Sequence, residues 1–255
     1  MVNPKEVSGQ PATLVVGAGP GVGFEVARRF GQAGHQVALV RRNAQALAKT
    51  VERLREEGIS AFGYAADATD PQALKSAIEA SIEHSGRLDV LHYCVPGPLR
   101  RSYGPTTEIT HELITENLNA RVVGAVVSVA AALPSLREAR GALLFTSGIS
   151  DQTPYPLTAA IGVPQAALRL YALHLHNELA DDGVFVGYLP LANPPRYDDP
   201  AQEAARTDLP DGFNLTDRLL AADVAEAHFE LTRRRDMFER VLGVDDGRAT
   251  SSPGR

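Results

Sequence analysis

The stretch that decides the fold class runs from residue 13 to residue 23 and reads Thr13-Leu14-Val15-Val16-Gly17-Ala18-Gly19-Pro20-Gly21-Val22-Gly23. The apolar run before Gly17 is typical of a short buried strand, and the pattern after Gly21 is that of a helix. A glycine-rich turn between the two lets backbone N–H groups approach a pyrophosphate. The alternative is a tight turn without a ligand. Four glycines in seven residues would weaken such a turn, so the pattern favours a dinucleotide site.

Apolar runs alternate with helical patterns along the rest of the chain. Strands are expected at residues 14–16, 37–40, 59–64, 90–94, 142–146, 184–189 and 240–244. Helices are expected at residues 21–34, 44–57, 70–85, 111–133 and 164–180. Strands separated by helices imply βαβ units, hence a parallel sheet with helices on both faces. We therefore expect an α/β, doubly wound parallel sheet (Rossmann fold) in a single domain, with a core over about residues 11–246.

Two segments depart from this rhythm. Residues 193–217 are rich in Pro, Asp and Ala and offer little to bury. We interpret them as a flexible flap over the ligand site rather than a domain linker, because long irregular loops in compact domains are often lids. The tail at residues 247–255 is expected to be frayed.

Composition excludes several classes of protein. The 255 residues carry a formal charge of −6, whereas a nucleic-acid-binding face would be densely basic. No apolar run is expected to reach the length of a bilayer span, and no secretory signal is visible. One cysteine, Cys94, excludes an intrachain disulfide, and no cluster has metal-ligand spacing. These features predict a cytoplasmic protein without a metal, a nucleic-acid partner or a membrane partner.

The spacing of the glycines identifies a family. A GxGxxG pattern would need glycine at position 22, which is Val22, whereas Gly17, Gly21 and Gly23 fit GxxxGxG. That spacing resembles the short-chain dehydrogenase/reductase family. The resemblance implies a nicotinamide cofactor and a small-molecule substrate. The cofactor-binding positions that it implies are Gly17, Gly19, Gly21, Val22, Gly23, Asp67, Ala68, Gln165 and Pro190.

Two arginines, Arg41 and Arg42, follow the second expected strand, where an NAD-binding protein usually offers an acid to the ribose 2′-hydroxyl. An acid there would repel a 2′-phosphate, whereas two guanidinium groups would hold it through charge-assisted hydrogen bonds. The alternative is a solvated pair of charges at a helix entry. The chemistry favours NADP(H) over NAD(H).

The catalytic half of the resemblance fails. The family uses an Asn, a Ser, a Tyr and a Lys, and of these only Asn117 is matched. The Ser position falls on Gly148, one past Ser147, the Tyr position on Ile161 and the Lys position on Gln165. Isoleucine cannot transfer a proton, and glutamine brings no positive charge that would lower a pKa.

Other residues are candidates for the missing acid. Ser147 adjoins the lost Ser, and Tyr155 lies in a loop near the expected substrate, although an aromatic ring packed on a proline turn is the plainer interpretation of Tyr155. Pro164 is a further departure, because proline inside a helix removes a backbone hydrogen bond. The helix therefore either begins near Pro164 or kinks around Gly162.

Three functions remain open. The first is an NADP(H)-dependent oxidoreductase with an atypical site, acting on a small carbonyl, alcohol or enone, since hydride transfer is the cofactor's own chemistry. The second is a non-redox catalyst such as a cyclase, isomerase or dehydratase. The third is a non-catalytic NADP(H)-binding protein. The resemblance also implies a homodimer or homotetramer paired through the helices at 111–133 and 164–180.

Overall fold

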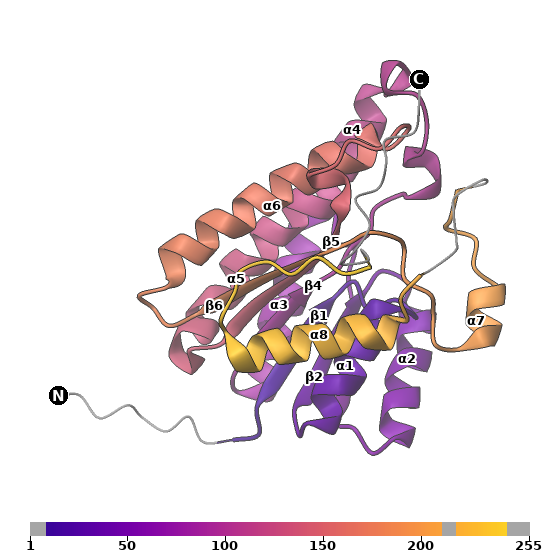
Figure 1. The fold of residues 1–255 in the computed structure, drawn as a ribbon. Helices are drawn as coiled ribbons and strands as arrows, with labels where there is room; N and C mark the ends of the chain where they lie inside the picture. The colour runs from indigo at the N-terminus through magenta and orange to yellow at the C-terminus, as the bar shows by residue number, and fades with distance from the viewer. Residues whose placement is uncertain (1–8, 211–217, 244–255) are drawn as a thin grey trace.

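A computed structural model describes residues 9–210 and 218–243 and contains a six-stranded sheet (Figure 1). The strand order is β3-β2-β1-β4-β5-β6, and each neighbouring pair is parallel. The strands are β1 (Ala12–Val16), β2 (Gln36–Arg41), β3 (Ala61–Ala65), β4 (Val90–Tyr93), β5 (Ala142–Gly148) and β6 (Phe185–Leu191). The predicted doubly wound parallel sheet is confirmed.

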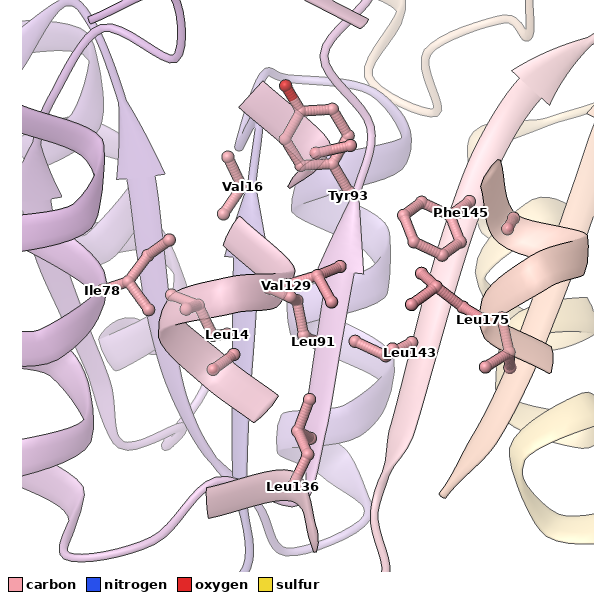
Figure 2. Packing of buried hydrophobic residues seen from close by; sticks show 14 of the residues in the cluster. Leu14, Val16, Ile78, Leu91, Tyr93, Val129, Leu136, Leu143, Phe145 and Leu175 are labelled. Carbon is pink, nitrogen blue, oxygen red and sulfur yellow. The ribbon is translucent and has the colours of Figure 1, made fainter. Parts of the chain in front are cut away.

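Helices cover both faces of this sheet. They are α1 (Val22–Gln32), α2 (Ala44–Glu56), α3 (Pro71–Ser85), α4 (His111–Leu118), α5 (Gly124–Ala139), α6 (Ala159–Leu179), α7 (Pro200–Ala204) and α8 (Ala221–Arg234). One buried cluster joins the sheet to α1, α2 and α8, and the other joins it to α3, α5 and α6. Figure 2 shows the second cluster, in which Leu91 and Leu143 of the sheet pack near Val129 of α5.

The first βαβ unit positions the site. Val15 of β1 is fully buried, with its strand between β2 and β4. Phe24 and Phe30 on one side of α1 are buried in the α1, α2 and α8 cluster. The N-terminus of α1 therefore lies at the carboxyl end of the sheet, next to the topological switch between β1 and β4.

The strand expected at 240–244 is largely wrong. Within the described residues it is reduced to two isolated parallel bridges to β6, Glu239 with Tyr188 and Leu242 with Leu191. Residue 244 and the tail at 247–255 lie outside the described residues. Helix α8, which the sequence analysis did not anticipate, fills the layer beside β6.

The helix expected at 111–133 is longer and is interrupted. It continues from His111 to Ala139 through a π-helical segment at Asn119–Val123. By length and composition alone this 29-residue stretch could cross a membrane, with a mean hydropathy of 1.4, which contradicts the expectation that no run is long enough. Ala125, Val129 and Leu136 bury its α5 part against the sheet, as a core helix would.

Helix α6 begins at Ala159, so the expected start near Pro164 is wrong and Pro164 lies inside the helix. The helix extends past the proline on both sides because its buried face, which includes Ile161, Leu168 and Leu175, packs on the core. Tertiary packing here overrides a local helix breaker.

Candidate active site

A cavity of about 240 Å³ opens at the carboxyl ends of the strands. Its walls come from five places: the glycine turn, the loop after β4, the end of β5, the first turns of α6 and the segment after β6. Pro194, Pro195 and Tyr197 of the expected flap line it, so the described part of that flap does cover the site. Residues 211–217 of the flap lie outside the described residues.

The glycine turn has the geometry that its sequence predicts. Gly17 has a φ of 95°, and a Cβ atom there would lie 2.8 Å from the backbone of Cys94. A Cβ atom on Gly23 would lie 2.6 Å from the carbonyl oxygen of Gly17. The N–H groups of Gly21, Val22 and Gly23 have no hydrogen-bond acceptor in the described part of the chain. These three donors and the cavity form a ready anion site at the N-terminus of α1.

The two arginines after β2 have different surroundings. Arg41 contacts the Thr50 hydroxyl at 3.5 Å and forms no ion pair within residues 9–210 and 218–243. Burial lowers the pKa of Arg41. Arg42 is exposed and lies 3.4 Å from the carboxylate of Asp67. The other oxygen of Asp67 accepts hydrogen bonds from the backbone and hydroxyl of Thr69.

The ring of Tyr197 closes the space between the glycine turn and Arg41. A Cβ atom on Gly21 would lie 2.6 Å from Cε1 of Tyr197, so the ring occupies the approach that the glycine opens. Arg206 stacks on the other face of the ring at 4.2 Å, and the charge of Arg41 acts on the phenol. As a consequence Arg41, Arg42, Asp67 and Ala68 do not line the cavity in this closed arrangement.

The expected catalytic positions are brought together but carry no proton relay. Ser147, Gly148, Ile161 and Gln165 all line the cavity. With its amide turned so that the nitrogen faces the carbonyl, Gln165 donates to the Gly148 oxygen at 3.3 Å and accepts from the Gly148 N–H at 3.0 Å. A Cβ atom on Gly148 would lie 2.5 Å from the Gln165 amide nitrogen, so glycine and glutamine fit each other here. The amide of Gln165 is thus engaged by protein backbone.

Three other predicted site residues lie outside the cavity lining. Tyr155 is 40% exposed, and its carbonyl accepts hydrogen bonds from Thr158 in a turn. Pro190 is buried in β6. Asn117 is fully buried and hydrogen-bonds Ser102 and Arg121, so it supports the wall rather than the reacting space.

The sequence analysis missed Arg121, which does line the cavity. It lies in the π-helical segment between α4 and α5 and is 4% exposed. A signal was present, because Arg121 is the one charged residue between Glu116 and Arg137 in an otherwise apolar helix. Charges in such a stretch are rare unless they are paired or functional.

It also missed a buried imidazole pair. The Thr146 hydroxyl, which lines the cavity, lies 2.8 Å from Nε2 of His92 and 2.8 Å from Nε2 of His228. The two rings meet edge to face with centroids 4.7 Å apart. Burial lowers the pKa of His92 to about 3 and that of His228 well below its usual value. Both rings are therefore neutral at neutral pH.

Known proteins agree with this architecture. The family model described as short chain dehydrogenase matches residues 11–192, and the chain belongs to that family of oxidoreductases. A polyketide-synthase protein of Streptomyces virginiae named for ketoacyl reduction is 31% identical over 179 residues, 68% of this chain and 66% of the relative. The peroxisomal 2,4-dienoyl-CoA reductase of Arabidopsis thaliana is 39% identical over 88 residues, 34% of this chain and 29% of that enzyme. The chain thus matches less than a third of that reductase's length.

Among solved structures, an alcohol dehydrogenase of Thermococcus sibiricus complexed with 5-hydroxy-NADP superposes with a TM-score of 0.77. The alignment covers 91% of this chain and 95% of the dehydrogenase at 20% identity. At that identity the likeness establishes the shared fold.

Proposed function

We propose that this chain is an NADP(H)-dependent reductase of an atypical kind, acting on a small carbonyl, alcohol or enone. The observation that carries the proposal is the combination of an anion site at the α1 N-terminus with Arg41, a cation that has no acidic partner in the described part of the chain. Relatives named for ketoacyl and dienoyl reduction, and the NADP compound in the Thermococcus enzyme, support it.

The residues present fit such a cofactor. The N–H groups of Gly21, Val22 and Gly23 would hold the diphosphate, and Arg41 with Arg42 would hold a 2′-phosphate. Asp67 lies beside Arg42, where it would meet the adenosine half. The ring of Tyr197 must leave Gly21 before a dinucleotide can enter. When bound, the nicotinamide would supply a hydride, and the chain's own residues would position the acceptor.

Proton supply is what makes the site atypical. Ile161 presents a hydrocarbon wall, and the Gln165 amide is engaged by Gly148. The hydroxyl nearest the lost Ser position is that of Ser147, whose oxygen is buried and has no hydrogen-bond partner among the described residues. Ser147 can therefore hold a substrate oxygen, while the proton itself comes from solvent.

This same loss favours a second candidate. A site without a proton donor also suits a non-redox catalyst of this fold, or a chain that binds NADP(H) without turnover. Incubation with NADPH and a panel of carbonyl and enone compounds separates them by loss of nicotinamide absorbance. Product rearrangement without loss of NADPH would favour the non-redox catalyst, and tight binding without any reaction would favour the binding protein.

Cofactor titration tests the central proposal. NADPH should bind more tightly than NADH, and Arg41→Ala should weaken NADPH by about tenfold to a hundredfold while changing NADH little, since hydrogen bonds to charged groups contribute about 1.5–3 kcal/mol. The matched control is Arg233→Ala, an exposed arginine of α8, which should change neither affinity. Equal affinities that Arg41→Ala leaves unchanged would end the proposal.

A further inference from the structure

Arg121 is a buried cation without a counter-ion. Its Nη1 donates a hydrogen bond to Oδ1 of Asn117, and it takes part in no ion pair within the described ranges. Burial lowers the pKa of its guanidinium to about 10, and no carboxylate contributes to that shift. Arginine stays protonated at neutral pH even so. The positive charge is therefore uncompensated in the free protein.

A second arginine of the same cavity shows the usual arrangement. The side chain of Arg206 is 7% exposed and lies 2.7 Å from Asp208 and 3.5 Å from Glu203. Burying a charge without a partner costs several kcal/mol, so buried arginines are normally paired in this way. Arg121 lacks such a pairing although it faces the same space.

The guanidinium is held in place from behind. The side-chain nitrogen of Asn117 donates to the Ser102 hydroxyl at 2.8 Å and to the Leu113 carbonyl at 2.9 Å. Ser102 in turn donates to the Pro98 carbonyl at 2.7 Å. A side chain at Gly97 would collide with Nη1 of Arg121, so the backbone of the β4 loop packs directly on the group. These contacts orient one edge of the fork and leave the other donors for the cavity.

Apolar side chains surround the remaining space. Val95 and Leu99 come from the loop after β4, and Ile161 and Leu168 come from α6. A ligand that satisfies both the walls and the cation has a hydrocarbon body and one planar anionic group. Arginine matches a carboxylate with two parallel hydrogen bonds, which gives orientation as well as affinity.

We propose that Arg121 binds the carboxylate of an apolar organic acid, and that the substrate of this site is such an acid. The second statement rests on the proposed reductase function, whereas the first does not. In this assignment Asn117 and Ser102 are positioning residues, because they act through Arg121.

The test uses trans-cinnamate and its neutral amide, cinnamamide, titrated calorimetrically into the full chain without cofactor. Cinnamate should bind at least about tenfold more tightly than cinnamamide, and Arg121→Met should abolish that preference. Arg121→Lys keeps a charge but loses the fork, so it should retain part of the preference. Arg101→Met, at an exposed arginine paired with Glu116 one loop away, is the matched control and should change nothing.

Two arms guard against other causes. Inorganic pyrophosphate should bind Arg121→Met as well as it binds the unaltered chain; an equal loss for pyrophosphate would assign Arg121 to the cofactor phosphates and overturn the proposal. Thermal unfolding checks that Arg121→Met folds, and if it does not, Arg121→Lys and the cinnamate-to-cinnamamide ratio of the unaltered chain decide. Equal binding of acid and amide by the unaltered chain would also overturn it.

The outcome is separable from that of the reductase proposal. A chain that prefers cinnamate through Arg121 and binds no NADPH would refute the cofactor assignment alone. A chain that binds NADPH through Arg41 and shows no carboxylate preference would refute the assignment of Arg121 alone.

Discussion

The hydroxyl of Thr146 is shared by two imidazoles beneath the cavity, those of His92 and His228. A hydroxyl donates one hydrogen, so one ring must accept it and the other must donate its Nε2–H to the oxygen. The Nδ1 atoms of both rings have no partner among the residues that the structure describes. A proton added to either ring would be buried without compensation, which is the physical reason for the lowered pKa values.

This pair makes stability depend on pH. The folded pKa values lie below the unfolded value of about 6.5, so the unfolded chain binds more protons once the pH falls below that value. Stability is complete above about pH 6.5 and falls on acidification by about 1.4 kcal/mol per pH unit for each buried imidazole, until the folded pKa is reached. Urea unfolding between pH 5 and pH 7.5 measures this slope.

The variant His228→Gln isolates the effect. It removes one of the two titrating rings, so its free energy of unfolding should fall less steeply with acid than that of the unaltered chain. His174→Gln, on the half-exposed face of α6, is the control and should keep the full slope. Identical slopes for the unaltered chain and His228→Gln would contradict the account.

At the scale of elements, the first βαβ unit could be predicted from the sequence because its signals are local. The glycines from Gly17 to Gly23 specify a backbone path, and Asp70, whose carboxylate accepts from the backbone N–H groups of Gln72 and Ala73, specifies a helix start. Tertiary packing decided the cases that were wrong or missed. Helix α6 runs through Pro164 because its buried face is held by the core.

The candidate site divides in the same way. Ser147, Gly148, Ile161 and Gln165 were placed together correctly, because strand and helix register carry them to one edge of the sheet. Arg121 and Tyr197 were missed because each reaches the site from a segment without a motif, a π-helical turn and an irregular loop. Asn117 was nominated by pattern, yet its side chain is turned towards Ser102 and Arg121.

The segment that carries Tyr197 gives a prediction of its own. The ring is clamped between Gly21 and Arg206, and the backbone N–H of Tyr197 donates to Glu203 at 2.9 Å. A dinucleotide must displace the ring, and this displacement reduces its apparent affinity. Tyr197→Ala should therefore tighten NADPH binding severalfold, as measured by nicotinamide fluorescence. Tyr197→Phe keeps the ring on Gly21 and should leave the affinity nearly unchanged; weaker binding by Tyr197→Ala would mean that the ring holds the cofactor instead.

At the scale of the whole molecule, the outer face of α6 remains apolar. Val163 and Leu170 are both 57% exposed, and they lie two helical turns apart on one face. Val126 of α5 is 41% exposed as well. Apolar side chains gathered on neighbouring helices mark an association surface more often than isolated ones do. This fits the homodimer or homotetramer that the sequence led us to expect through the same two helices.

Light scattering after size exclusion tests this surface. At micromolar concentration the unaltered chain should have at least twice the monomer mass of 27.2 kDa, and Val163→Glu with Leu170→Glu should reduce it to the monomer, because burying two carboxylates in a contact costs more than the contact gains. Met237→Glu changes an apolar residue of similar exposure away from α6, and it should leave the assembly intact. Since Ile161 and Leu168 of the same helix line the cavity from its inner face, loss of the assembly should also loosen that wall and weaken cinnamate binding. A monomeric unaltered chain, or a double variant that stays assembled, would exclude α6 as the contact.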